Sequence, residues 1–244
     1  EMKVRSTEKE IMDDPGCDPV LLLRTVDQFA AINRIVSRYR RILSRLVLDD
    51  MKLAPHRTYH MVDIGAGGCD IMLWLLRESR RRGLKLQVTA IDIDPRIINH
   101  ARMRTADEGG LNVQMLDAFE ISNLAPVDYV FANHFSHHLE HEKIVDLLGI
   151  IASTVKRTFV LSDLARSYFS YAGFFLLSNL FFRNSFAISD GLQSIRRGFL
   201  LDELRMIATN AGLAHRTSIW RLPPGRLVLH GTGQEILEEL EGTG

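Results

Sequence analysis

The sequence predicts an α/β fold with a doubly wound, mostly parallel sheet of seven strands. Two observations lead to this fold class. Between residues 59 and 162, short apolar runs alternate with helical patterns, which is the order of repeated strand–helix–strand units. Near the end of the chain, two further strand patterns flank a Leu-Pro-Pro-Gly turn at residues 222–225 and predict an antiparallel pair. The length of 244 residues suits one such domain with appended helices.

The individual elements follow from apolar periodicity and from residues typical of helix ends. Strands are predicted at residues 59–64, 86–91, 113–116, 129–132, 158–162, 216–221 and 226–230. Helices are predicted at residues 70–82, from 95 onward, at 141–155, at 201–210 and, as a short exposed segment, at 234–241. Asp94 and Pro95 are typical of an N-cap and a first helical position. Because parallel strands end at a common edge of the sheet, we expect the ligand site at that edge.

Two helical segments outside this alternation are expected to cover the site. Residues 27–48 carry apolar side chains at helical spacing and predict one helical arm before the core. Four arginines form a second stripe on this arm, interpreted as a solvated face: Arg34, Arg38, Arg41 and Arg45. The apolar run at residues 164–182 is interrupted by polar residues, so we expect a buried or capping helix there and not a membrane span.

These segments suggest a division of the chain. Residues 1–52 are expected to form an N-terminal helical arm or lid. Residues 53–244 are expected to form the main domain, with a cap insertion at about 164–200.

Composition narrows the class of protein. Thirty Lys and Arg residues balance thirty Asp and Glu residues, so the chain has no net field that would attract nucleic acid or an acidic membrane. Cys17 and Cys69 are the only cysteines, too few for a disulfide framework or a zinc ribbon. The N-terminal stretch lacks the apolar core of a signal peptide. We therefore expect a cytoplasmic monomer or homodimer without stable membrane insertion.

The segment at residues 61–70 predicts a buried strand, a glycine turn and the start of a helix. Gly65 and Gly67 let the backbone approach a ligand closely, and the helix N-terminus offers free amides. A dinucleotide fingerprint requires a third glycine three places after the second, where Asp70 stands. Hydride transfer is therefore disfavoured.

Carboxylates follow the predicted strands at the same edge of the sheet. Asp92 ends the second strand, where an acidic side chain binds both hydroxyls of a ribose. Asp117 follows the third strand and precedes Ala118 and Phe119, a combination suited to framing an adenine. A single aspartate at a strand end is more often a helix cap. Together with Asp63 on the first strand, the set points to a nucleoside ligand.

On these motifs the chain resembles the class I S-adenosylmethionine-dependent methyltransferases, and within them the small-molecule group that includes ubiquinone and menaquinone biosynthesis. The resemblance covers about residues 59–230, and its motifs lie at residues 62–67, 90–95, 116–118 and 128–134. One departure is Cys69, which stands where the usual pattern has a third glycine. The resemblance implies a Rossmann-like methyltransferase fold and S-adenosylmethionine as the cofactor. It also implies the cofactor-binding residues Asp63, Gly65, Gly67, Asp92, Ile93, Asp117, Ala118 and Asn133.

A histidine-rich turn at residues 133–142 directly follows the fourth strand, which faces the methyl donor in the family. A neutral histidine takes a proton from a hydroxyl near neutral pH, so His137 or His138 is the expected general base. A histidine here is also typical of a helix cap or a core hydrogen bond. His137 and His141 have helical spacing, but no third ligand is evident, so no metal is expected.

The cap region provides the expected acceptor contacts. Aromatic and aliphatic residues at 164–199 more often form core or dimer surface than a pocket. If they line a pocket, the acceptor is apolar, and the expected substrate-binding residues are His134, Tyr168, Phe174 and Arg197.

The predicted reaction is methyl transfer to a hydroxyl oxygen of a small hydrophobic phenolic or enolic molecule. Carbon or nitrogen acceptors stay open. Methylation of RNA or protein, and a cofactor-binding protein without catalysis, are further alternatives.

Overall fold

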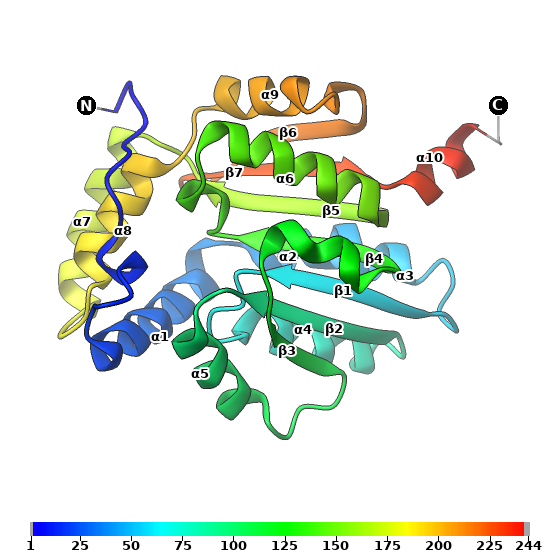
Figure 1. Cartoon of the computed structure of the whole chain (residues 1–244), viewed down its shortest axis with the longest axis horizontal. Coiled ribbons are helices and arrows are strands. Elements are labelled where there is room, and N and C mark those ends of the chain that lie inside the picture. Colours follow the sequence, from blue (N-terminus) through cyan, green and yellow to red (C-terminus); the bar gives the residue numbers. More distant parts are fainter. Residues whose placement is uncertain (1, 242–244) are drawn as a thin grey trace.

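The computed structural model describes residues 2–241, so residue 1 and residues 242–244 of the predicted domain ranges lie outside it. At its centre is a sheet of seven strands in the order β3-β2-β1-β4-β5-β7-β6 (Figure 1). The strands are β1 Thr58–Ile64, β2 Lys85–Asp92, β3 Leu111–Met115, β4 Val127–Asn133, β5 Val155–Leu164, β6 Thr217–Leu222 and β7 Arg226–Thr232. The first five strands pair in parallel, whereas β7 is antiparallel to both β5 and β6. The predicted fold class is confirmed.

Helices cover both faces of the sheet. Five of them agree closely with the predicted segments: α4 Asp70–Arg81, α5 Pro95–Thr105, α6 His141–Thr154, α9 Leu201–Asn210 and α10 Gln234–Glu241. Val62 packs on one face in a cluster with Leu147 of α6 and Ile207 of α9. The next side chain back along β1, Met61, packs on the other face with Met72 of α4. This alternation follows from the two-residue period of a strand.

The predicted arm is not one helix. It divides into α1 Pro19–Val36, α2 Tyr39–Leu43, a π-helical turn at Ser44–Leu48 and α3 Asp49–Met51. The break lies at Arg38, which has a left-handed φ of 51°. The preceding residue, Ser37, donates a hydrogen bond from its hydroxyl to the carbonyl oxygen of Asn33 at 2.7 Å. Leu22 and Val26 of α1 pack near α5 on Ile97. The later helices instead join the cluster around α4.

The arginine stripe is divided by the same break. All four of its side chains are exposed, which agrees with the interpretation as a solvated face.

The predicted cap region forms α7 Tyr168–Phe181 and α8 Ala187–Arg197. Together with α1 and the N-terminal segment, these helices gather beside the carboxyl ends of the parallel strands (Figure 1). Of the two expectations for residues 164–182, a buried or a capping helix, the buried one is wrong for the outer face of α7, where Phe169 is 80% exposed and Leu176 68% exposed. The inner side packs on α8, where the Phe174 ring lies against Gly191, and the same ring lies 5.9 Å from that of Phe182 at the end of α7. Among the described residues, none of the helices has the length and apolar character needed to cross a membrane.

Candidate active site

A pocket of about 730 Å³ lies at the carboxyl ends of β1, β2 and β4. This edge is the topological switch point of the sheet, because β1 pairs with β2 on one side and with β4 on the other. Val26, Phe29 and Asn33 of α1 contribute to its wall. Met12 and Asp13 contribute from η1, the short helix Ile11–Asp13 of the N-terminal segment.

The glycine turn after β1 has the backbone conformation that its sequence predicts. Gly65 and Gly67 both line the pocket and have φ values of 79° and 49°. A β-carbon on Gly65 would lie 3.2 Å from the Phe135 ring, which is a tight contact, and the positive φ disfavours any side chain there. Cys69 has a φ of 58°, a left-handed conformation that glycine adopts without strain. This explains why a glycine is usual at that position.

Three carboxylates occupy the same end of the pocket. Burial, followed by the charges of Asp70 and Asp92, raises the pKa of Asp63 well above its usual range. Burial also raises the pKa of Asp92. The hydrogen bonds that Asp92 accepts from backbone amides, including that of Gly67, lower its pKa but do not outweigh burial. Asp70 has a raised pKa for the same reason, and its Oδ2 is buried without a hydrogen-bond partner. Crowded carboxylates of this kind favour a ligand that brings positive charge or hydroxyl donors.

The next part of the pocket follows β2 and β3. Ile93 lies beyond Asp92 and is 68% exposed. Asp117 lies at the N-terminus of η3, the helix Ala118–Leu124, and accepts a hydrogen bond from the Phe119 amide at 3.0 Å. One carboxylate oxygen therefore serves as the helix cap, and the residue still lines the pocket with Ala118.

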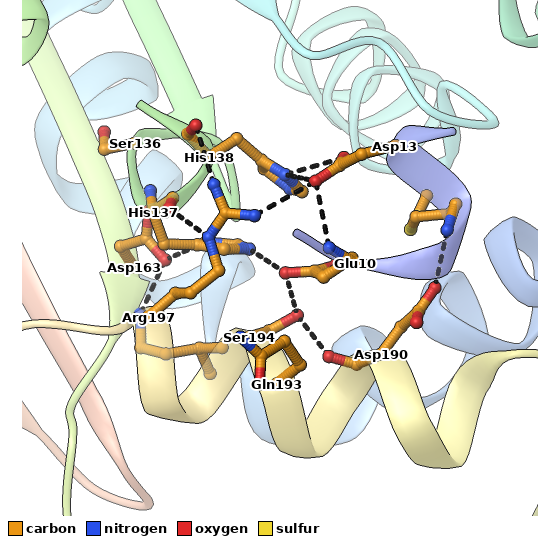
Figure 2. A network of polar contacts seen from close by, with 12 residues as sticks. Glu10, Asp13, Ser136, His137, His138, Asp163, Asp190, Gln193, Ser194 and Arg197 are labelled. Atoms are coloured by element: carbon orange, nitrogen blue, oxygen red, sulfur yellow. Dashed lines mark hydrogen bonds and ion pairs between the residues drawn. The ribbon is translucent and has the colours of Figure 1, made fainter. Parts of the chain in front are cut away.

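His137 lies in a buried polar network beside the pocket (Figure 2). It belongs to η4, the turn Ser136–His138, and is 1% exposed. Its Nδ1 lies 2.7 Å from Asp163 Oδ1, and its Nε2 lies 3.3 Å from Glu10 Oε1. Burial opposes protonation, but the two carboxylates prevail and raise the pKa of His137 to about 9. His137 is therefore an imidazolium at neutral pH.

His138 lines the pocket and pairs with the N-terminal segment. Its Nδ1 lies 3.0 Å from Asp13 Oδ1. Burial works against ionisation of Asp13, but the hydrogen bond from His138 prevails and lowers the pKa of Asp13 to about 2. Arg197 holds this pair in place: it contacts Asp13 at 3.0 Å and donates to the carbonyl oxygens of His137 and His138 at 2.9 and 2.8 Å (Figure 2). Asp190 accepts from the amides at the start of η1, both at 2.9 Å.

The structure gathers most of the predicted site residues in the pocket. These are Asp63, Gly65, Gly67, Asp92, Ile93, Asp117, Ala118, Asn133, His134 and His138. It does not bring His137, Tyr168, Phe174 or Arg197 to the pocket wall. Tyr168 is 69% exposed on the outer face of α7, and the ring of Phe174 is taken up by contacts with α8. His137 and Arg197 lie behind the wall, in the polar network.

Sequence reasoning did not assign Asp13 or Asp70 to the site, although both line the pocket. Asp70 departs from the dinucleotide fingerprint, but a polar residue that opens a helix after a glycine turn is a usable signal for a site residue. Asp13 carried no signal, because it meets His138 across 125 positions of the chain.

Comparison with known proteins finds a similar domain family and solved structures with a similar fold. Residues 62–158 match a family model described as a methyltransferase domain, and no curated protein sequence matches the chain. Among solved structures, the magnesium protoporphyrin IX methyltransferase of Synechocystis PCC 6803, with bound SAH, is 16% identical, with a TM-score of 0.52 over 92% of this chain and 91% of that one. The CurJ carbon methyltransferase is 14% identical, with a TM-score of 0.62 over 89% of this chain and 61% of that one. The plantazolicin methyltransferase BamL is 12% identical, with a TM-score of 0.58 over 92% and 88%.

At these identities the solved structures inform the fold, and the expected kinship with the ubiquinone and menaquinone group stays a prediction. The family match spans the glycine turn, Asp92, Asp117 and the histidine turn. The chain therefore has the fold of the class I S-adenosylmethionine-dependent methyltransferases, and its residues 62–158 are similar to the methyltransferase domain family.

Proposed function

We propose that the protein transfers the methyl group of S-adenosylmethionine to a hydroxyl oxygen of a small, hydrophobic, phenolic or enolic molecule. The observation that carries this proposal is a single pocket that combines the carboxylates of Asp63 and Asp92 with the imidazole of His138. Its volume is that of a site for small ligands.

The carboxylate end fits the cofactor. The bound cofactor supplies an electrophilic methyl group on a positively charged sulfur. Asp63, Asp70 and Asp92 have raised pKa values, so a nearby positive charge would stabilise their ionised forms. In this assignment Asp92 binds the ribose hydroxyls and Asp117, with Ala118, holds the adenine.

His138 is the general base in this proposal. Asp13 accepts at its Nδ1, which leaves the lone pair of the neutral ring on Nε2. That nitrogen takes the proton from the acceptor hydroxyl, a contribution of ~100- to 10,000-fold in rate. His137, the other candidate, is already protonated at neutral pH and so has no lone pair to offer. Positioning of the two reactants contributes up to ~7–11 kcal/mol.

The remainder of the wall suits an apolar acceptor. Val26 and Phe29 of α1, Phe119, Phe135 and Leu139 all line the pocket. A macromolecular acceptor would require an open surface beside the methyl group, whereas here α1 and the N-terminal segment contribute to the wall. A small molecule is therefore favoured over RNA or protein as the acceptor.

The test is formation of S-adenosylhomocysteine in the presence of a panel of phenols and enols. An isotopically labelled methyl group distinguishes oxygen, carbon and nitrogen products by NMR. His138→Gln is expected to lower turnover by ~100-fold or more while cofactor affinity is retained. His100→Gln, at an ion pair with Asp27, is the matched control. Full turnover in the His138 variant at neutral pH would show that His138 is not the general base. If no acceptor gives S-adenosylhomocysteine, the proposed methyltransferase activity is wrong.

A further inference from the structure

Arg226 is the first residue of β7, lies beside the end of β4 and is 2% exposed. In the described part of the chain, no carboxylate lies within ion-pair distance of this buried cation. One guanidinium nitrogen contacts His134 Nε2, and another lies 2.5 Å from Asn133 Oδ1 and 3.2 Å from Ser162 Oγ. Burial lowers the pKa of Arg226 to about 10 despite the charge of Asp163, which leaves the side chain charged at neutral pH.

These contacts fix the direction of each hydrogen bond, because a guanidinium only donates. His134 Nε2 must therefore accept. Burial, together with the charge of Arg226, lowers the pKa of His134 well below its usual value, so the ring is neutral and its single proton is on Nδ1. Asn133 Oδ1 must likewise accept, so the amide nitrogen of Asn133 is the free end of that side chain.

Both free ends are N–H donors without a partner of their own among the residues that the structure describes. They are not sealed in the core, unlike Asp70 Oδ2, which is fully buried and unpaired. Asn133 and His134 both line the pocket. Arg226 therefore occupies the acceptor atom of each of these two side chains, which leaves their N–H donors free, and its positive charge is in contact with both.

We propose that Asn133 and His134 form a subsite for a negatively charged oxygen and that Arg226 is the positioning residue that sets their donors. This inference rests on the proposed function and deepens it. The oxygen belongs either to the ionised hydroxyl of the acceptor or to the carboxylate of the cofactor's methionine part. In either case the oxygen would lie in the pocket that both residues line, and charge-assisted hydrogen bonds to it are about twice as strong as neutral ones.

The decisive variant is Asn133→Asp, which keeps the shape and keeps one oxygen for Arg226, but replaces the amide donor with a charged acceptor. Three probes are titrated: S-adenosylhomocysteine, 5′-methylthioadenosine, which lacks the carboxylate, and para-nitrophenolate added to protein saturated with S-adenosylhomocysteine. A loss of about tenfold or more for nitrophenolate alone assigns the subsite to the acceptor. The same loss for S-adenosylhomocysteine, with methylthioadenosine unchanged, assigns it to the cofactor carboxylate.

Asn99→Asp is the matched control, because it introduces the same charge on the exposed face of α5, outside the pocket wall. It is expected to change each affinity by less than about threefold. An equal loss in both variants would attribute the effect to general repulsion and overturn the subsite. The subsite would also be overturned if Asn133→Asp kept its affinity for S-adenosylhomocysteine and nitrophenolate showed no loss of binding. The second condition is met when nitrophenolate binds both proteins equally or binds neither of them.

The role of Arg226 has a direct readout in the ring nitrogens of His134 by NMR. The expected tautomer has the proton on Nδ1, and Arg226→Lys, whose single ammonium group lacks the fork that reaches both neighbours, is expected to give a mixture. A proton on Nε2 in the wild-type protein would overturn the proposal whatever the ligand. Failure of the subsite is distinguishable from failure of the proposed function, because S-adenosylhomocysteine formation by the wild-type protein is measured separately.

Discussion

The buried imidazolium of His137 predicts a folding stability that falls as the pH rises above neutral. Asp163 and Glu10 face its two ring nitrogens. The two arginines beside the turn, Arg5 and Arg197, donate to its carbonyl oxygen at 2.8 and 2.9 Å. The ring is thus held in its charged form by carboxylates, in a part of the protein that water does not reach.

The size of the effect follows from the pKa of His137 in the two states. The value is 6.5 in the unfolded reference and about 9 in the folded protein, where the carboxylates prevail over burial. At ~1.4 kcal/mol for each pKa unit, protonation contributes about 3 kcal/mol to the free energy of unfolding. Because the folded value is the higher one, this contribution is complete below the unfolded pKa of 6.5 and disappears as the pH rises through about 9.

The assay is urea unfolding at several pH values between ~6 and ~9.5. The wild-type protein is expected to lose about 3 kcal/mol across this interval, and His137→Gln is expected to lack that loss. Glu10→Gln, which removes one of the two carboxylates, is a milder variant and is expected to reduce the loss. His100→Gln should behave as the wild type does, because a pair with a surface carboxylate such as Asp27 contributes only ~0–1 kcal/mol. A wild-type protein whose stability varies by less than ~1 kcal/mol over the interval would refute the reasoning.

Further predictions concern the pocket and its cover. Asp92→Ala is expected to weaken S-adenosylmethionine binding more than about tenfold in calorimetry, since charge-assisted hydrogen bonds of ~1.5–3 kcal/mol are lost; an unchanged dissociation constant would remove the ribose role. Asp117→Ala should act in the same direction with a smaller effect, and unaltered binding would exclude it from the site. Asp13→Asn is expected to lower turnover by about tenfold with cofactor affinity retained, and Asp14→Asn to leave turnover unchanged; equal effects would argue against the pairing with His138.

The sequence by itself determined the order of strands and helices and the glycine turn that opens the pocket. These features are local. The period of apolar residues distinguishes strands from helices, and Asp94, with its hydrogen bond of 2.8 Å to the Arg96 amide, marks a helix start that depends only on its neighbours. The predicted cofactor residues follow the ends of parallel strands, and the topology of such a sheet brings those ends to one edge.

Only the tertiary structure decided the break at Arg38, the exposed face of α7 and the different surroundings of His137 and His138. The apolar spacing of residues 27–48 continues across the break, so periodicity alone could not reveal that the two halves pack on different surfaces. His137 and His138 are adjacent and chemically identical. They differ because Asp163 and Glu10 enclose the first, whereas Asp13 pairs with the second at the pocket wall. The protonation of a side chain depends on burial and on the charges that the fold places around it, and in this turn those charges come from distant parts of the chain.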